Sequence, residues 1–378
     1  MNWQLFQDLT VANKRSDKLK GFRSNITLKF TSKDFDSSLL KKEFSSSFDD
    51  FLKRMTIDEN SVDVIQSNLA RRRIVFSYLA SSNERVVVKW FDDKAIGCFN
   101  FIGSLDNERL LHSDIGVRVN SRLIPKYIDH GEDFIAVEMV QGDPFLKLIQ
   151  DENLAPLEIA VNELLEELRI VYRGTVEGNF TVRDFNRRLH SEYSYLISTR
   201  FNIRSEVVMA AYCTPSNAQA IYYELNSRLY EIYAGISGNL PMHMTLRDLD
   251  EHNLLFDDES STTYAVDMED AVPGHFIFDI SYLLGRLILG RDPVKIGDVI
   301  LPIVDDWIVT MDPKNADSLI AMIRALTTKQ LIISAMNPWL WPAESTFKRD
   351  KGKSSRQRYR WLKAVWQVIE LQRQRTLV

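Results

Sequence analysis

The sequence is poor in cysteine, glycine and proline and contains no long apolar run. Its two cysteines, Cys98 and Cys213, have neither a metal-ligand spacing nor the pattern of a disulfide framework. The 15 glycines and 11 prolines among 378 residues exclude collagen-like and low-complexity designs. The longest apolar runs, at 282–289 and 299–304, are far shorter than the roughly 18–20 residues that span a bilayer. The first residues also lack the order of a signal peptide, so we expect a soluble, cytoplasmic protein with no membrane partner.

What is present is an ordinary globular composition. Hydrophobic residues make up 45% of the chain and charged residues 26%, values that exclude wholesale disorder. A chain of 378 residues usually forms two domains or two lobes. We therefore expect a folded protein with a sizeable core in more than one compact part.

Charge is distributed unevenly along the chain. Residues 347–378 carry ten Lys or Arg against two acidic residues, so the rest of the chain has a net charge of −13. Residues 242–270 hold nine Asp or Glu against Arg247 alone. The basic end is either a solvated helix face or a contact for an anionic partner or the acidic body of the chain. Its apolar residues recur at helical spacing, which predicts a helix that docks on the core through Tyr359, Leu362, Trp366 and Ile369.

The hydrophobic pattern divides the chain into three parts. Residues 1–60 predict an accessory N-terminal segment, residues 61–140 a small β-rich lobe, and residues 141–378 a helical lobe. In the β-rich lobe the pattern predicts five strands, at Val62–Ile65, Ile74–Leu79, Arg85–Phe91, Arg122–Tyr127 and Asp133–Val140.

Helices dominate the rest of the pattern. One helix is predicted around Phe101–Ile115, within the β-rich lobe. In the helical lobe a hairpin of Leu254–Phe256 and Thr263–Met268 interrupts the helices, which resume at Phe278–Leu289. The fold class that follows is α+β.

Residue types suited to phosphoryl transfer follow one another along this framework. Lys89 lies near the end of a β-branched strand, and Glu108 lies on the predicted helix. A lysine neutralises the phosphates of a nucleotide, and a carboxylate on a neighbouring helix holds that lysine in place. Asp248 and Asn253 lie in the polar loop before the hairpin, and Asp267 lies at its end. An aspartate can orient or deprotonate an acceptor hydroxyl, while an amide oxygen and a second carboxylate suit Mg²⁺.

These residues stand in motifs that resemble those of a known family. Leu246–Asn253 (LRDLDEHN) looks like the catalytic loop H-R-D-L-x-x-x-N of protein kinases and the related loop of their small-molecule relatives. Asp267–Glu269 (DME) is similar to the D-F-E of aminoglycoside phosphotransferases and choline-kinase-like enzymes, and Arg85–Lys89 resembles their V-x-K strand. Phe278–Ile280 (FDI) resembles the helix start that follows in this branch. The chain thus resembles the aminoglycoside phosphotransferase and choline-kinase-like family over about 61–289.

The resemblance implies a protein-kinase-like fold in which a β-rich lobe and a helical lobe enclose ATP and Mg²⁺. It implies that Asp248 is the catalytic aspartate and that Asn253 and Asp267 are metal ligands. Asp279 would be an N-cap or a backbone anchor for the catalytic loop. We expect the site to form in a cleft between the two lobes.

The resemblance also implies the nucleotide contacts. Lys89 and Glu108 would form the ion pair that anchors phosphate, with Asp106 as the alternative carboxylate. Glu138 and Val140, at the junction of the lobes, would offer backbone groups to adenine.

Two features depart from the family pattern. Leu246 stands where the family has the first histidine of the loop, which removes a supporting hydrogen-bonding group but no reacting atom. No glycine occurs between Gly21 and Gly97, so the phosphate loop would have to use Gln66–Ala70. The remaining histidines of this region, His243 and His252, are expected in turns or at the surface.

The sequence favours an ATP- and Mg²⁺-dependent phosphotransferase that acts on a hydroxyl of a small molecule of aminoglycoside, amino alcohol or sugar type. Only eleven residues separate Asp267 from Asp279, too few for the segment on which protein kinases bind a peptide. One alternative is a catalytically silent binding module. The other is a modifier of a protein or another macromolecule that docks through residues 1–60 or the basic C-terminal helix. A nucleic-acid partner is disfavoured, because the sequence has no aromatic-basic RNA pattern outside that helix.

Overall fold

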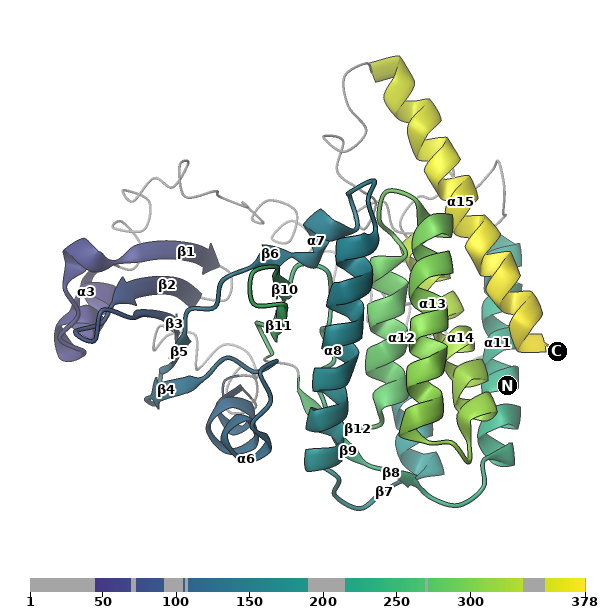
Figure 1. Ribbon diagram of the computed structural model, residues 1–378, viewed down its shortest axis with the longest axis horizontal. Helices are drawn as coiled ribbons and strands as arrows, with labels where there is room; N and C mark the ends of the chain where they lie inside the picture. The colour runs from purple at the N-terminus through teal and green to yellow at the C-terminus, as the bar shows by residue number, and fades with distance from the viewer. Residues whose placement is uncertain are drawn as a thin grey trace, which may run out of the picture. The chain divides into compact units, whose positions relative to one another are not determined.

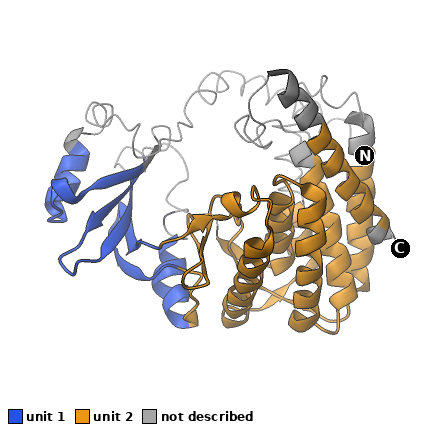
Figure 2. Cartoon of the chain, turned by 45° about the horizontal axis from the view of Figure 1, so that its top comes forward, with its two compact units in different colours: residues 1–118, 125–140 blue, residues 119–124, 141–378 orange. Residues whose placement is uncertain are grey.

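The computed structural model describes residues 45–68, 73–91, 105, 108–189, 215–268, 271–335 and 351–377. The chain forms two compact units (Figure 2). Unit 1 takes the described residues up to Arg118 together with Pro125–Val140, and unit 2 takes Val119–Ile124 and the chain from Gln141 onward. The first unit therefore ends at Val140.

Unit 1 is built on a five-stranded antiparallel sheet with the order β1-β2-β3-β5-β4 (Figure 1). Its strands are β1 (Asp63–Asn68), β2 (Arg73–Leu79), β3 (Arg85–Phe91), β4 (Tyr127–His130) and β5 (Phe134–Glu138). The β-branched run of β3 places it in the middle of the sheet, paired with β2 and β5. Val86, Val88 and Trp90 alternate into the core, so Lys89 stands on the opposite face.

Helix α3 (Ser45–Arg54) packs on this sheet through aromatic side chains. The ring of Phe51 lies 5.5 Å from those of Trp90 and Phe134 and 6.1 Å from that of Phe76. Arg54 adds an ion pair at 2.7 Å to Asp133, the residue just before β5. The described part of the predicted accessory segment is thus integral to the core of unit 1.

Most of the predicted strands are confirmed, with one wrong assignment. The strand expected at Arg122–Tyr127 forms instead at Tyr127–His130, because Pro125 has no N–H to donate to a sheet. Gln66, expected to start the phosphate loop, lies in β1, and residues 69–72 lie outside the described part of the chain.

The described residues of the helix predicted around Phe101–Ile115 are helical, and the helix continues beyond Ile115. Helical residues are described from Glu108 through η2 (Leu110–Gly116), which is wound as a π-helix, to α6 (Val117–Val119). The structure does not describe residues 101–104, 106 and 107. Glu108 is therefore at the start of the described helical run.

Unit 2 is mainly helical. Its longer helices are α8 (Ala155–Gly174), α11 (Pro215–Gly235), α12 (Phe276–Leu287), α13 (Pro293–Met311), α14 (Ala316–Ala335) and α15 (Lys351–Leu377), with a short α7 (Phe145–Leu148). Helix α14 packs against α11, α12, α13 and α15 (Figure 1). The predicted docking of the C-terminal helix is confirmed for Leu362, Trp366 and Ile369, which are buried together with Trp361 and Val365. The side chain of Tyr359 lies outside the described part of the helix. No helix among the described residues has the length and apolar content needed to cross a bilayer.

Short strands of unit 2 carry the loops that matter for the site. The predicted hairpin is confirmed as β10 (Leu254–Asp257) and β11 (Thr262–Ala265), with β6 (Asp143–Pro144) on the other edge of β10. The remaining pairs are β9 (His243–Thr245) with β12 (Val272–Gly274) and β7 (Asn179–Phe180) with β8 (Leu240–Pro241). Leu246–Asn253 thus runs between two fixed strands, β9 and β10.

The packing of α3 predicts that Phe51→Ala destabilises the protein by about 3–5 kcal/mol, because it leaves a cavity among three aromatic rings. Urea unfolding followed by circular dichroism measures the loss. Asp50→Ala, at an exposed position of the same helix, should change the free energy of unfolding by at most about 0.5 kcal/mol. Equal effects of the two substitutions would contradict the role of α3 as part of the core.

Candidate functional site

The loop Leu246–Asn253 is anchored by one buried carboxylate. Oδ2 of Asp279, on α12, accepts the backbone N–H of Leu246 at 2.7 Å, and Oδ1 accepts that of Arg247 at 3.0 Å. The hydroxyl of Tyr172 also donates to Oδ2, at 2.9 Å. Burial raises the pKa of Asp279, and these hydrogen bonds oppose that shift. The interpretation of Asp279 as a backbone anchor is confirmed, whereas the N-cap of α12 is His275.

Within the loop, the carboxylate of Asp248 is held at both oxygens. Nδ2 of Asn253 donates to Oδ2 at 3.0 Å and also to the backbone carbonyl of Asp248 at 3.0 Å. The hydroxyl of Tyr282, on α12, donates to Oδ1 at 3.0 Å. Two donors from different elements therefore fix the orientation of this carboxylate.

Asn253 and Asp267 lie beside each other at the open end of the β10–β11 hairpin. The N–H of Val266, the residue before Asp267, donates to the carbonyl of Asn253 at 2.8 Å. Because the Asn253 amide nitrogen is turned to Asp248, its oxygen Oδ1 faces away from that carboxylate. Asp267 has a φ of +61°, a conformation that Asp tolerates better than most residues.

This donor set fits Mg²⁺, which prefers oxygen ligands and keeps several waters. The two side chains supply one amide oxygen and one carboxylate from adjacent positions of one hairpin. The described residues contain no group of three or more His, Cys, Asp or Glu side chains that could hold a metal. Asn253 and Asp267 would thus supply two of the oxygen ligands that a metal at this place needs.

Two acidic residues hold the rest of the loop by hydrogen bonds and an ion pair. Oδ1 of Asp250 accepts the N–H groups of His252 at 2.8 Å and Asn253 at 3.0 Å. Glu251 forms a buried two-point ion pair with Arg286 of α12, at 2.6 and 2.8 Å. Both carboxylates thus stabilise the loop itself.

In unit 1 the structure brings Lys89 and Glu108 together. Nζ of Lys89 lies 2.5 Å from Oε1 of Glu108, and the two side chains are only 12% and 2% exposed. Oε2 of Glu108 is buried with no hydrogen-bond partner among the described residues. His112, one turn later, places Nε2 4.0 Å from Oε1, and burial lowers its pKa to about 4. His112 is thus neutral near pH 7, and Lys89 carries the positive charge beside Glu108.

The stretch from Glu138 to Val140 covers the last residue of β5 and the last residues of unit 1. The N–H of Glu138 donates to the carbonyl of Lys126 at 2.9 Å, and the N–H of Met139 donates to that of Arg85 at 3.0 Å. Within the described residues we find no hydrogen bond from the N–H of Val140.

The prediction that His243 lies in a turn or at the surface is wrong. Its ring is 2% exposed and lies parallel to that of Phe276, at 5.7 Å. Nε2 of His243 accepts the backbone N–H of Phe276 at 2.8 Å, and Nδ1 of His275 accepts that of Ile277 at 3.4 Å. Burial lowers the pKa of His243 to about 4, so the ring stays a neutral acceptor at the start of α12. His252, in contrast, is 37% exposed.

Sequence reasoning missed Tyr282 and Arg286, which hold the loop from α12, and Tyr172 of α8, which donates to Asp279. The available signal was the spacing of Asp279, Tyr282 and Arg286, which places three polar groups on one face of an otherwise apolar helix. Two predicted residues, Asp106 and Glu269, lie outside the described residues.

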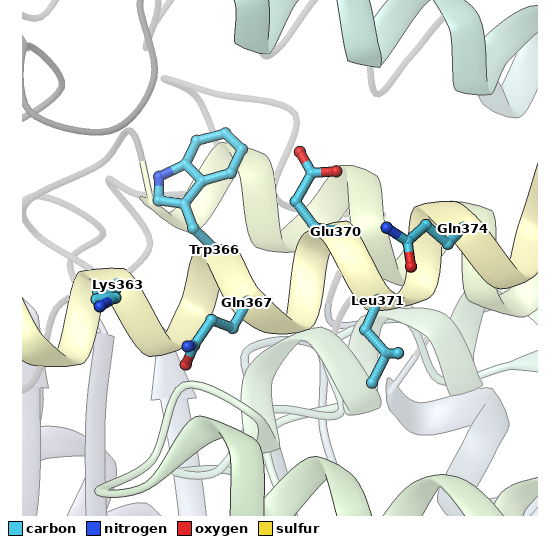
Figure 3. A pocket seen from close by; sticks show the side chains of 6 residues that line it. All are labelled: Lys363, Trp366, Gln367, Glu370, Leu371 and Gln374. Atoms are coloured by element: carbon cyan, nitrogen blue, oxygen red, sulfur yellow. The ribbon is translucent and has the colours of Figure 1, made fainter.

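A surface hollow of about 390 Å³ lies elsewhere in unit 2. Its described lining comes from α15 alone and consists of Lys363, Trp366, Gln367, Glu370, Leu371 and Gln374 (Figure 3). It contains none of the candidate site residues, so we do not assign the site to it.

Several solved structures are similar to this chain. Ethanolamine kinase from Plasmodium vivax matches 93% of this chain and 98% of its own at a TM-score of 0.52 and 13% identity. Choline kinase from Cryptosporidium parvum matches over 86% of this chain and 96% of its own, at a TM-score of 0.46 and 13% sequence identity. The aminoglycoside phosphotransferase APH(4)-Ia matches over 86% of this chain and 98% of its own, at a TM-score of 0.47 and 14% sequence identity. No family model and no curated protein matches the sequence.

The match to ethanolamine kinase extends over nearly the whole of both chains. It confirms the predicted α+β, protein-kinase-like fold and, at the level of fold, the resemblance to the choline-kinase-like branch. At 13% identity it shows the fold alone.

The pKa of His243 predicts a pH dependence of stability. Because burial lowers that pKa from 6.5 to about 4, the folded protein binds fewer protons than the unfolded chain between these values. The stabilisation is present above pH 6.5 and is lost as the pH falls towards 4, by about 3 kcal/mol. Urea unfolding of the wild type and of His243→Gln should show a stability difference that shrinks by this amount from pH 7 to 4. A difference that does not change with pH would rule out a neutral, buried His243.

Proposed function

We propose that this chain is a cytoplasmic, ATP- and Mg²⁺-dependent phosphotransferase that moves the γ-phosphoryl group to a hydroxyl of a small molecule. The observation that carries the proposal is the double hold on Asp248, by Asn253 and Tyr282, in a loop fixed to Asp279. Preorganised carboxylates of this kind serve proton transfer and positioning. The fold shared with ethanolamine kinase supports the same reaction class.

In this proposal Asp248 orients the acceptor hydroxyl and receives its proton. The acceptor oxygen forms a bond to the γ-phosphorus while the bond from that phosphorus to the β,γ-bridging oxygen breaks, and ADP leaves with the electron pair. Asn253 Oδ1 and the Asp267 carboxylate would hold Mg²⁺, which when bound neutralises charge on the phosphates.

Unit 1 would supply the nucleotide contacts. Glu108 holds the Lys89 ammonium at 2.5 Å, which preorganises that charge for the α- and β-phosphates. The N–H of Val140, which has no hydrogen-bond partner among the described residues, and a carbonyl of the same stretch would meet adenine.

The acceptor we propose is a small alcohol rather than a protein. Eleven residues separate Asp267 from Asp279, and they include β12, so little chain remains to bind a peptide. Ethanolamine is the acceptor to test first, because the protein with the shared fold is named for it. Choline, aminoglycosides and sugars follow, as small hydroxyl compounds of the type that the sequence motifs favour.

The first test of the proposal is Asp248→Asn. With Mg-ATP and a pool of such acceptors, the wild type should form ADP and a phosphorylated product. The variant should lower kcat by about 100-fold to 10,000-fold, because it can no longer take the proton. Asp258→Asn, in the exposed turn of the hairpin, should leave kcat unchanged. Turnover that persists in Asp248→Asn would overturn the assignment of the base.

The second test concerns the ion pair of unit 1. The double substitution Lys89→Met/Glu108→Gln avoids leaving one charge buried alone, which would cost about 3–5 kcal/mol. It should weaken Mg-ATP binding, measured by calorimetry, by at least about tenfold, because a phosphate contact is lost. The matched control, Arg54→Met/Asp133→Asn, removes another ion pair of the same unit and should bind Mg-ATP like the wild type.

The calorimetry and the turnover assay together separate the proposal from a catalytically silent module, which Leu246 would favour. The side chain of Leu246 is buried, while its backbone N–H is held by Asp279. The loop therefore keeps its anchor without the family histidine. Nucleotide binding without any turnover would favour the silent module.

A further inference from the structure

Tyr282 lies outside the sequence motifs yet touches the proposed base. We propose that Tyr282 is a positioning residue for Asp248, whose carboxylate it fixes by donating its hydroxyl to Oδ1 at 3.0 Å. This inference rests on the proposed function, in which Asp248 receives the proton of the acceptor. It adds a residue that the resemblance does not supply.

One face of α12 holds the loop at three points. Asp279 binds the backbone at the start of the loop, Tyr282 binds Asp248 in its middle, and Arg286 binds Glu251 near its end. The spacing of three and then four residues places these side chains above one another on the helix. Since α12 is buried along most of its length and packs on α14, the three contacts have a rigid support.

The chemistry of the hydroxyl suits positioning and not proton transfer. Burial, together with the neighbouring Asp248, raises the pKa of Tyr282 far above its ordinary value, so the hydroxyl stays protonated. It can therefore donate to Oδ1 throughout the working pH range. With Asn253 on Oδ2, the carboxylate cannot turn about its last bond without losing two hydrogen bonds.

The test is Tyr282→Phe, which keeps the ring and removes the donor. We expect kcat to fall about tenfold while KM for Mg-ATP stays within about twofold, because the base loses its orientation and the nucleotide keeps its contacts. Tyr233→Phe is the matched control. It removes a hydroxyl that donates to the carbonyl of Phe180 at 3.1 Å, and it should change neither value. An unchanged kcat in Tyr282→Phe, or an equal fall in both variants, would overturn the inference.

A second readout does not depend on turnover. The carboxyl ¹³C resonance of Asp248 at pH 7, identified by its loss in Asp248→Asn, should change its chemical shift in Tyr282→Phe, because the carboxylate has lost a hydrogen bond. Tyr233→Phe should leave that resonance where it is in the wild type. If the wild type phosphorylates no acceptor, the proposed function fails, and this resonance still decides whether Tyr282 acts on Asp248. An unchanged chemical shift refutes the contact.

Discussion

The order of the loop depends on the buried carboxylate of Asp279. Burying a carboxylate is costly unless hydrogen bonds meet its charge. Here two backbone N–H groups of the loop and the hydroxyl of Tyr172 do so. Because the carboxylate needs the loop and the loop needs an acceptor for its amides, each stabilises the other. That mutual dependence holds Arg247 at a φ of +65° and brings the next residue, Asp248, to its two donors.

Much of the fold could be predicted from the sequence because local patterns specify it. The β-branched alternation of Arg85–Phe91 predicts β3 with the observed bounds, and the helical spacing of Leu362, Trp366 and Ile369 predicts the buried side of α15. The order of the motifs then predicts a kinase-like fold, which the similarity to ethanolamine kinase confirms. Asp279 could be interpreted as an anchor for the loop because its motif places an aspartate at the start of a predicted helix.

Contacts between distant segments could not be predicted in this way. Tyr282 and Arg286 stand in an apolar stretch that reads as core, and only the fold shows that their partners are 34 and 35 residues earlier in the chain. In the sequence His243 resembles a turn residue, because its burial depends on the pairing of β9 with β12 and on the stacking of its ring on Phe276. The packing of α3 could not be predicted from the sequence for the same reason, since its partners lie on three different strands.

The acidity of residues 242–270 illustrates why a charge count is a poor guide to the acceptor. Asp250 caps the loop, Glu251 is neutralised by Arg286, and Asp257 accepts the N–H of Glu259 and the hydroxyl of Ser260 in the hairpin turn. These carboxylates stabilise the fold through short contacts, and the ion pair with Arg286 offsets the charge of Glu251. The acidic stretch therefore does not by itself favour a cationic acceptor over a neutral one. Selectivity must then depend on side chains that contact the acceptor directly.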